Sequence, residues 1–181
     1  MKKFELTNEF ITNMFGTKLF RIRALVEFGD VEAGELGGYV EKESNLGHDD
    51  NAWVYGNAWV YGDAQVSGGA LVYGNAWVYG DAQVSGDARV CGDARVCGNG
   101  DYAYAHGFGS VNRTTTFFRL KDGGVGVRCG CFYGTLAQFR DKIRETHGET
   151  KKAQEYLMLA DLMELRFEED ENEVGNRKYV E

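Results

Sequence analysis

Hydrophobic and polar positions repeat every six residues over the middle of the chain. Residues 51–98 form eight successive hexads, each with Ala in its second place, Val in its fourth and Gly in its sixth. Because residues two apart in an extended strand point to the same side, Ala and Val share one interior and the intervening residues face outward. A glycine followed by Asn, Asp or Gly tolerates positive φ, which predicts a sharp corner between hexads.

A second, longer period sets the number of sides. Residues 51–68 and 69–86 are identical at 16 of 18 positions, so three hexads make one turn. The pattern predicts a triangular prism of parallel strands whose coils stack at about 4.8 Å. A helix is excluded, because each of these glycines would cost about 1 kcal/mol and no hydrophobic position recurs at 3.6 residues.

The flanking segments predict the ends of the prism. Residues 37–46 read as a degenerate first coil, with Leu46 six residues before Ala52, and residues 101–109 read as a frayed last coil. Because an open coil exposes a sheet edge, a capping segment is expected at each end. The expected regions are an N-terminal cap (1–30), a hexapeptide-repeat β-helix (31–110) and a C-terminal α+β module with an acidic tail (111–181).

The C-terminal module has its own signals. Residues 114–120 and 125–132 each predict a strand, joined by a turn at residues 121–124. Thr135 followed by Gln138 is a capping-box signature that opens a helix, and a second amphipathic helix follows.

Composition excludes several classes of protein. Glycine supplies 25 of the 181 residues and proline none, which excludes collagen and proline-rich linkers. No apolar run approaches the ~18 residues of a membrane span, and no signal-peptide core follows the N-terminus. We therefore expect a cytoplasmic protein whose four cysteines are thiols rather than disulfides.

The net charge of −8 is unevenly distributed. Residues 24–88 carry eleven acidic residues and one basic residue, whereas residues 113–152 carry nine basic and four acidic residues. The overall acidity argues against a dedicated nucleic-acid-binding protein, so direct DNA binding is not expected. The basic surface is either solvated or contacts an anion or an acidic partner.

The entry segment and the repeat together resemble a known family. The matching features are Leu19-Phe20-Arg21-Ile22, Phe28-Gly29-Asp30-Val31, Gly37-Gly38-Tyr39-Val40 and Asn45-Leu46, followed by the NAWVYG and DARV hexads. Over residues 18–107 the chain is similar to hexapeptide-repeat left-handed β-helix proteins of bacteria, prophages and phages. The resemblance implies left-handed coils and frequently trimers, and it implies no agreed activity. We expect a mainly β protein: a left-handed triangular parallel β-helix of about four coils with an N-terminal cap and a small C-terminal α+β module.

The outward positions form three columns, because the longer period stacks them. The Trp53 side continues through Leu71 to Arg89, the Trp59 side through Trp77 to Arg95, and the Gln65 side to Gln83. Two sides are therefore apolar and one is polar, and exposed apolar patches usually mark an interface. Two such sides favour a homotrimer closed by heterologous contacts. The expected interface residues are Trp53, Tyr55, Tyr61, Leu71 and Tyr73.

A second interpretation is ligand binding. A base or another planar group would stack on the aromatic column while arginines hold its phosphate, which indicates a nucleotide or another anionic small molecule. The two interpretations are compatible if the ligand lies in the cleft between two protomers. The expected ligand-binding residues are Trp59, Trp77, Tyr79, Arg89 and Arg95.

Catalytic candidates are few. Acyltransferases on this prism are known by resemblance to use a histidine base beside a coenzyme A cleft, and His106 at the frayed end is the better candidate, ahead of His48. A solvent-facing histidine is the simpler interpretation of His106. No cofactor is expected, and the enzyme interpretation is not preferred.

The cysteines show no four-ligand metal set. Cys129 and Cys131, two apart on the predicted strand, would be buried beside valines as inert thiols, although a redox or metal pair is the alternative. Cys91 and Cys97 take outward places of their hexads.

These observations favour a non-catalytic trimeric binding protein. A phage- or prophage-encoded role in the host cytoplasm follows as a hypothesis: the protein would sequester a nucleotide signal or block a host defence protein. The alternatives are a hexapeptide-class acyltransferase and an acidic rod that mimics DNA, the latter suggested by the charge of residues 24–88.

Overall fold

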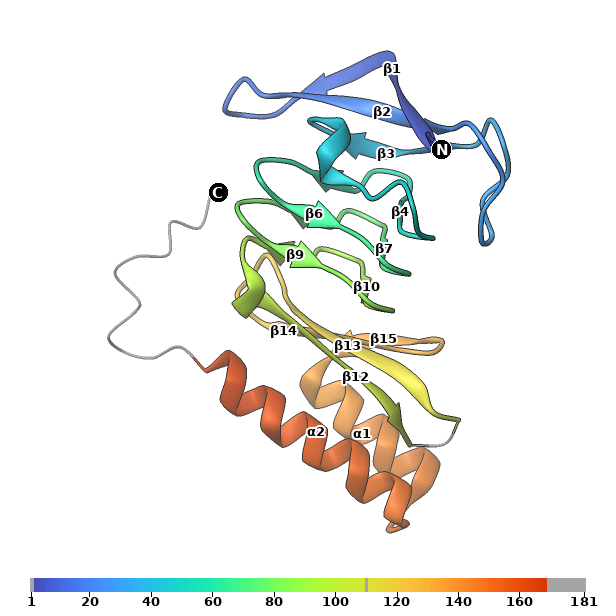
Figure 1. Cartoon of the computed structure of the whole chain (residues 1–181). Coiled ribbons are helices and arrows are strands. Elements are labelled where there is room, and N and C mark those ends of the chain that lie inside the picture. The colour runs from blue at the N-terminus through green and yellow to red at the C-terminus, as the bar shows by residue number, and fades with distance from the viewer. Residues whose placement is uncertain (1, 110, 169–181) are drawn as a thin grey trace.

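The computed structural model describes residues 2–109 and 111–168. The chain builds three layers along one axis: antiparallel N-terminal strands, a solenoid of stacked coils, and a sheet backed by two helices (Figure 1). The predicted fold class, a mainly β chain built on a parallel β-helix, is confirmed. Most of the predicted acidic tail lies outside the described residues.

The coils stack with their strands parallel and in register. Trp59 pairs with Trp77 and Trp77 with Arg95, so the predicted coil of three hexads is confirmed. The chain crosses the facing side of Figure 1 from left to right and descends with each coil, which is left-handed winding. The Trp59 side consists of β3 (Leu36–Val40), β5 (Trp59–Val60), β8 (Trp77–Val78) and β11 (Arg95–Val96), the Trp53 side of β4 (Trp53–Val54), β7 (Leu71–Val72) and β10 (Arg89–Val90), and the Gln65 side of β6 (Gln65–Val66) and β9 (Gln83–Val84).

Small side chains fill the interior of the coils. Every Ala and Val of the eight hexads is 0% exposed. The corner glycines from Gly56 to Gly92 have φ between +60° and +73°, which side chains other than glycine rarely tolerate. At Gly80 a β-carbon would also overlap the carbonyl oxygen of Cys97, so glycine is required there for space as well as conformation.

The first coil is two residues longer than the others. Val40 pairs with Val60, and Leu46 forms a bridge with Val66, so both pairs are separated by three hexads plus two residues. The expectation that Leu46 takes an alanine place, six residues before Ala52, is therefore wrong, because Leu46 occupies a valine place. The extra residues form a corner held by Asp50, whose carboxylate accepts from the Gly68 backbone at 2.6 Å.

A hairpin caps the upper end of the solenoid. β1 (Phe4–Thr12) and β2 (Lys18–Ala24) pair antiparallel, and β2 pairs antiparallel with β3. The sheet of the Trp59 side therefore runs without a break from the last coil into the cap. Figure 1 shows this hairpin lying across the top of the coils.

Side chains satisfy the uppermost carbonyls on the other two sides. Lys3 Nζ, almost fully buried, donates to the carbonyl oxygen of Ala52 at 2.8 Å. Asn45, 0% exposed, donates through Nδ2 to the carbonyl oxygens of Gly62 at 3.1 Å and Ala64 at 2.8 Å. These bonds take the place of a further strand above each side.

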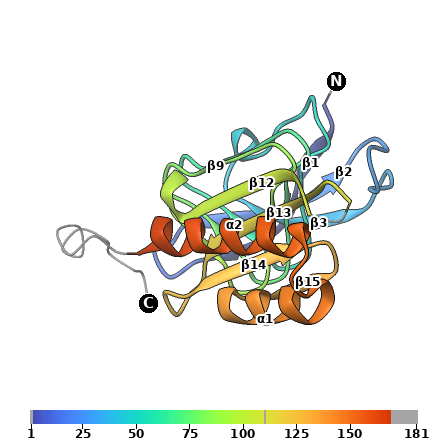
Figure 2. The ribbon, with the colours of Figure 1, turned by 90° about the horizontal axis from the view of Figure 1, so that it is seen from below.

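A four-stranded antiparallel sheet closes the lower end, with both helices on its far face (Figures 1 and 2). Within β13, Phe118 packs into the solenoid core and its neighbour Phe117 packs against the helices. The sheet is therefore the partition between two hydrophobic cores. Its strands are β12 (Tyr102–Phe108), β13 (Arg113–Arg119), β14 (Val125–Cys129) and β15 (Phe132–Thr135), and the helices are α1 (Leu136–His147) and α2 (Lys151–Phe167).

Two expectations about this module are corrected. Residues 101–109 do not continue the prism, because β12 pairs antiparallel with β13 and so belongs to the C-terminal sheet. The expected strand over residues 125–132 is a hairpin, because Gly130 has φ +58° and turns the chain between β14 and β15. The capping box is present: Thr135 Oγ1 accepts from the Gln138 backbone, and Gln138 Oε1 accepts from that of Thr135.

Replacing Asn45 should lower the unfolding free energy, because its side chain closes the upper edge of the Gln65 side. Asn45→Ala leaves the buried carbonyl oxygen of Ala64 and the partly buried one of Gly62 without this donor, and the expected loss in unfolding free energy is about 1–3 kcal/mol. Urea unfolding measures this loss. Gln65→Ala, an exposed change on the strand directly below, is the control and should stay within about 0.5 kcal/mol. Equal losses in both variants would contradict the role given to Asn45.

Candidate functional site

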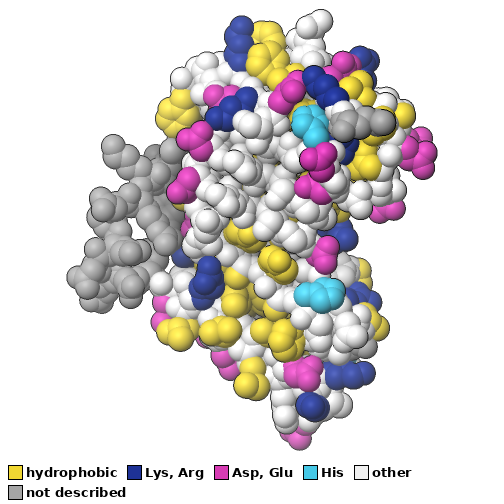
Figure 3. All heavy atoms as spheres, viewed as in Figure 1, with side chains coloured by type: hydrophobic (Ala, Val, Ile, Leu, Met, Phe, Trp, Pro, Cys, Tyr) yellow, Lys and Arg dark blue, Asp and Glu magenta, His cyan; other side chains and the backbone are white. Residues whose placement is uncertain are grey.

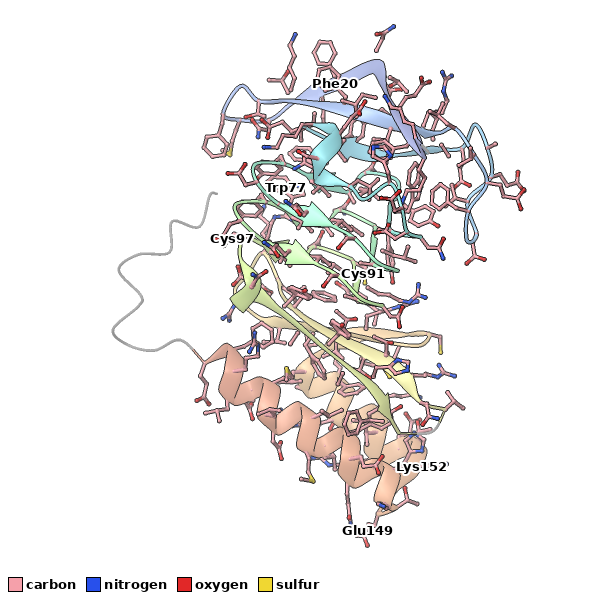
Figure 4. The ribbon with its side chains drawn as sticks, in the orientation of Figure 1. Phe20, Trp77, Cys91, Cys97, Glu149 and Lys152 are labelled. Atoms are coloured by element: carbon pink, nitrogen blue, oxygen red, sulfur yellow. The ribbon has the colours of Figure 1, made fainter. Side chains whose placement is uncertain are left out.

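The Trp59 side of the solenoid carries a continuous column of stacked side chains. Trp59 and Trp77 lie parallel, with ring centroids 4.4 Å apart and an interplanar angle of 5°. The guanidinium carbon of Arg95 lies 3.9 Å from the centroid of Trp77. Tyr39 precedes Trp59 in the same register. We call Tyr39, Trp59, Trp77 and Arg95 the ladder; Figure 4 labels Trp77 within it.

The ladder has a cation at both ends. Arg21 on β2 lies with its guanidinium carbon 5.2 Å from the Tyr39 ring centroid, and its Nη1 donates to the Tyr39 hydroxyl at 2.9 Å. Such cation–π contacts contribute about 0.5–2 kcal/mol each. Both faces of Trp77 are covered, one by Trp59 and the other by Arg95. Trp77 therefore offers its edge to solvent and not a ring face.

A groove of about 590 Å³ follows the ladder. Its polar lining includes Asn57, Asn75 and Asp93, which take the same place in successive coils, and Asn75 Nδ2 donates to Asp93 Oδ1 at 3.3 Å. Ile11 of the cap and Lys121 of the C-terminal module line it as well. All three parts of the chain therefore contribute to this one surface.

A second aromatic stack lies at the corner beside the ladder. The rings of Tyr61 and Tyr79 are 5.2 Å apart with an interplanar angle of 7°. Both belong with Leu19 to the hydrophobic cluster that backs the ladder. Burial raises the pKa of Tyr61 to about 12 and also raises the pKa of Tyr79. These hydroxyls stay neutral at physiological pH, and Tyr61 is too buried to offer much contact area.

Trp53 is not available to an interface. Its side chain is 0% exposed, with the ring of Phe28 at 5.3 Å and that of Phe4 at 6.2 Å, both nearly perpendicular to it. The expectation that Trp53 contributes to an interface is therefore wrong, because the cap folds over the uppermost rung of this side.

The rest of the Trp53 side remains partly open. Leu71 pairs with both Trp53 and Arg89, so the predicted column is confirmed. Leu71, Tyr55 and Tyr73 are half-buried and Arg89 is exposed.

The proposed ligand residues divide between two sides. Trp59, Trp77, Tyr79 and Arg95 share one side and its corner, whereas Arg89 on β10 lies on the Trp53 side. A single protomer therefore does not bring the five residues together.

The Gln65 side is polar. Gln65 and Gln83 are exposed, and Figure 3, which looks onto this side, shows few hydrophobic side chains over the coils.

The two histidine candidates lie in different parts of the chain. His106 is exposed on β12, in the C-terminal sheet, with its Nδ1 2.9 Å from Thr114 Oγ1. His48 stacks on Phe4 at 4.4 Å and accepts a bond from the Lys3 backbone, which are structural contacts. Among the described residues, no three His, Cys, Asp or Glu side chains gather in a way that would hold a metal ion.

Several residues of this site escape sequence reasoning. Tyr39 precedes Trp59 by one coil plus two residues, so the period of the hexads alone does not align the two. The motif Gly37-Gly38-Tyr39-Val40, with an aromatic residue before valine as in the hexads, is the signal that places it. Ile11 and Lys121 carry no such signal, because folding alone brings them to the groove.

Comparison with known proteins supports the solenoid. Two segments, residues 64–80 and 82–98, match the family model described as YdcK Beta solenoid repeat. The second match begins three hexads after the first, which is the length of one coil. No curated protein matches the chain. Neither α1 nor α2, the helices of the described residues, has the length and apolar character needed to cross a bilayer.

The tyrosine stack should make stability sensitive to alkaline pH. Because the pKa of Tyr61 is raised to about 12 in the folded protein, the unfolded chain ionises first. The neutral Tyr61 hydroxyl therefore makes its full contribution to the unfolding free energy below pH ~10. This contribution is lost as the pH rises towards 12. Urea unfolding across this range should give a shallower pH dependence for Tyr61→Phe than for the wild type.

Tyr104→Phe, at an exposed position outside the stack, is the control for this experiment. If Tyr61→Phe and Tyr104→Phe change the pH dependence equally, the burial of Tyr61 has no part in it.

Proposed function

We propose that this β-solenoid repeat protein is a non-catalytic interaction protein, and that its ladder side binds a protein surface, first of all another copy of the chain. The observation that carries the proposal is the parallel Trp59–Trp77 stack, in which both rings remain partly exposed along a groove. Tryptophan and arginine are the residues that most often dominate binding energy at protein interfaces. Because the coils already hold these side chains in place, association loses little side-chain entropy.

The covered ring faces favour a protein surface over a nucleotide. Stacking of a base needs a free aromatic face, and both faces of Trp77 are in use. Arg95 Nη1 already donates to the carbonyl oxygens of Asn75 at 3.0 Å and Ala94 at 2.8 Å. The ring edges and the polar wall of the groove fit a flat protein surface with both polar and apolar groups better than they fit a phosphate ester.

A homotrimer is the assembly that these sides support best. The ladder side of one protomer would meet the Trp53 side of the next, and three such heterologous contacts close a ring. Leu71, Tyr55 and Tyr73 supply apolar surface on the second side, and the polar Gln65 side would face solvent. Arg89 would then approach the ladder of the neighbouring protomer.

The assembled ring would leave the C-terminal modules free for a further partner. On α2 the side chains of Met158, Leu162 and Leu165 are 71%, 54% and 67% exposed and share one face. A host defence protein is the partner we propose for this face. The support is the resemblance of residues 18–107 to hexapeptide-repeat proteins of bacteria, prophages and phages. The proposed phage origin and the host cytoplasm as the place of action rest on that same resemblance.

The other two functions have weaker support. His106 lies outside the coils and the hexads run without an inserted loop, so no observation favours an acyltransferase. The ladder interrupts the acidic surface of the solenoid, which does not favour a DNA mimic.

Solution mass tests the proposed self-association. Light scattering coupled to gel filtration should give three times the chain mass for the wild type. Trp77→Glu places a charge inside the proposed contact and should shift the protein to monomers, with dissociation favoured by at least tenfold. Gln83→Glu introduces the same charge on the same coil but on the polar side, and should leave the trimer intact. A wild-type monomer, or equal effects of the two variants, would contradict the proposal.

A further inference from the structure

A second cavity lies in the C-terminal module, away from the ladder. It measures about 230 Å³ and lies between the β14–β15 hairpin and the helices. Its lining combines two thiols, three side chains that carry or can carry positive charge, and aromatic and aliphatic walls. The residues used below are Cys129, Cys131, Arg113, Lys142, His147 and Tyr156.

The two cysteines flank a tight turn. Cys129 pairs with Phe132, so only Gly130 and Cys131 form the loop between β14 and β15. Gly130 at φ +58° fits the first position of a two-residue hairpin turn. Such a turn brings α-carbons two residues apart into the range of about 4.4–6.8 Å that a disulfide spans.

The surroundings of the two thiols differ. Cys129 Sγ accepts a bond from Thr115 Oγ1 at 3.2 Å and lies 3.9 Å from the Tyr156 hydroxyl, and both of these partners are buried. Cys131 is exposed at the tip of the turn. One thiol is therefore positioned by the fold while the other is open to a reagent from solution.

Positive charge surrounds this pair. The guanidinium of Arg113 packs directly on Gly130, because a β-carbon at that position would overlap Arg113 Nη1. Lys142 and His147 line the same cavity, and the Lys142 ammonium is paired with Glu145, which does not line it, at 2.8 Å. Cations around a small cavity attract anionic reagents in preference to neutral ones.

We propose that Cys129 and Cys131 form a redox-active dithiol that reacts with an anionic small-molecule disulfide of the glutathione type. The Cys131 thiolate attacks one sulfur of the reagent, which forms a mixed disulfide and releases the first thiolate. The Cys129 thiolate then attacks the Cys131 sulfur, which forms the Cys129–Cys131 bond and releases the second thiolate. The two cysteines lose two electrons and two protons, and the reagent disulfide is reduced to two thiols.

The other cysteines have no such arrangement. Cys91 is 3% exposed on the last coil, and burial raises the pKa of its thiol. Cys97 donates to the Asp101 carboxylate at 2.9 Å. Figure 4 shows these two at separate places on the last coil, so they are not next to each other.

Oxidised glutathione is the probe for this proposal, applied to the reduced full-length protein and followed by intact mass and peptide mapping. The wild type should lose two hydrogens within the segment that carries residues 129–131 and should keep no glutathionyl group. Cys129→Ser removes the second step, so it should trap one glutathionyl group on Cys131. Cys97→Ser is the matched control and should behave as the wild type.

Salt and charge give a second readout. Lys142→Gln, or a rise in ionic strength, should slow the reaction with oxidised glutathione several-fold and leave the reaction with a neutral disulfide unchanged. The proposal is overturned if the wild type keeps a glutathionyl group on Cys131, if Cys129→Ser traps none, or if Cys97 reacts as fast as Cys131.

Discussion

The vertical registration of successive coils is the constraint on which the rest of the structure depends. Each rung pairs its backbone with the matching rung of the next coil, as Val60 does with Val78. Across the eight hexads this pairing requires the same small interior, which Ala and Val fill, and a corner residue that accepts positive φ. Once those conditions hold, identical outward residues are forced into columns. The ladder is therefore a direct consequence of how the backbone stacks.

Stacked coils leave an open edge above and below, and the chain closes the two edges by different means. Above, a hairpin extends one side while Lys3 and Asn45 replace the missing strand on the others. Below, an antiparallel sheet crosses the last coil and inserts Phe118 into its core. The lower closure also creates the cysteine hairpin, because β14 and β15 belong to the sheet that covers the last coil.

The coil length, the columns and the interior were predictable because a translational repeat needs no knowledge of distant contacts. The exposure of the outward side chains was not predictable from the repeat. Trp53 and Trp59 take the same place in their hexads, but Phe4 and Phe28 cover only Trp53. Because the first coil is two residues longer, the 18-residue period does not align Tyr39 with Trp59. The C-terminal corrections have a similar origin, since alternation predicts a strand at residues 101–109 without indicating which sheet it joins.

The central claim is that residues one coil apart form one energetically coupled column, and a double-mutant cycle on Trp59 and Trp77 tests it most directly. The unfolding free energies of Trp59→Ala, Trp77→Ala and the double variant should reveal a coupling of about 0.5–1.5 kcal/mol. The same cycle on Trp53 and Trp59, six residues apart on different sides, should give additive losses. Additive losses for Trp59 and Trp77 would contradict the account.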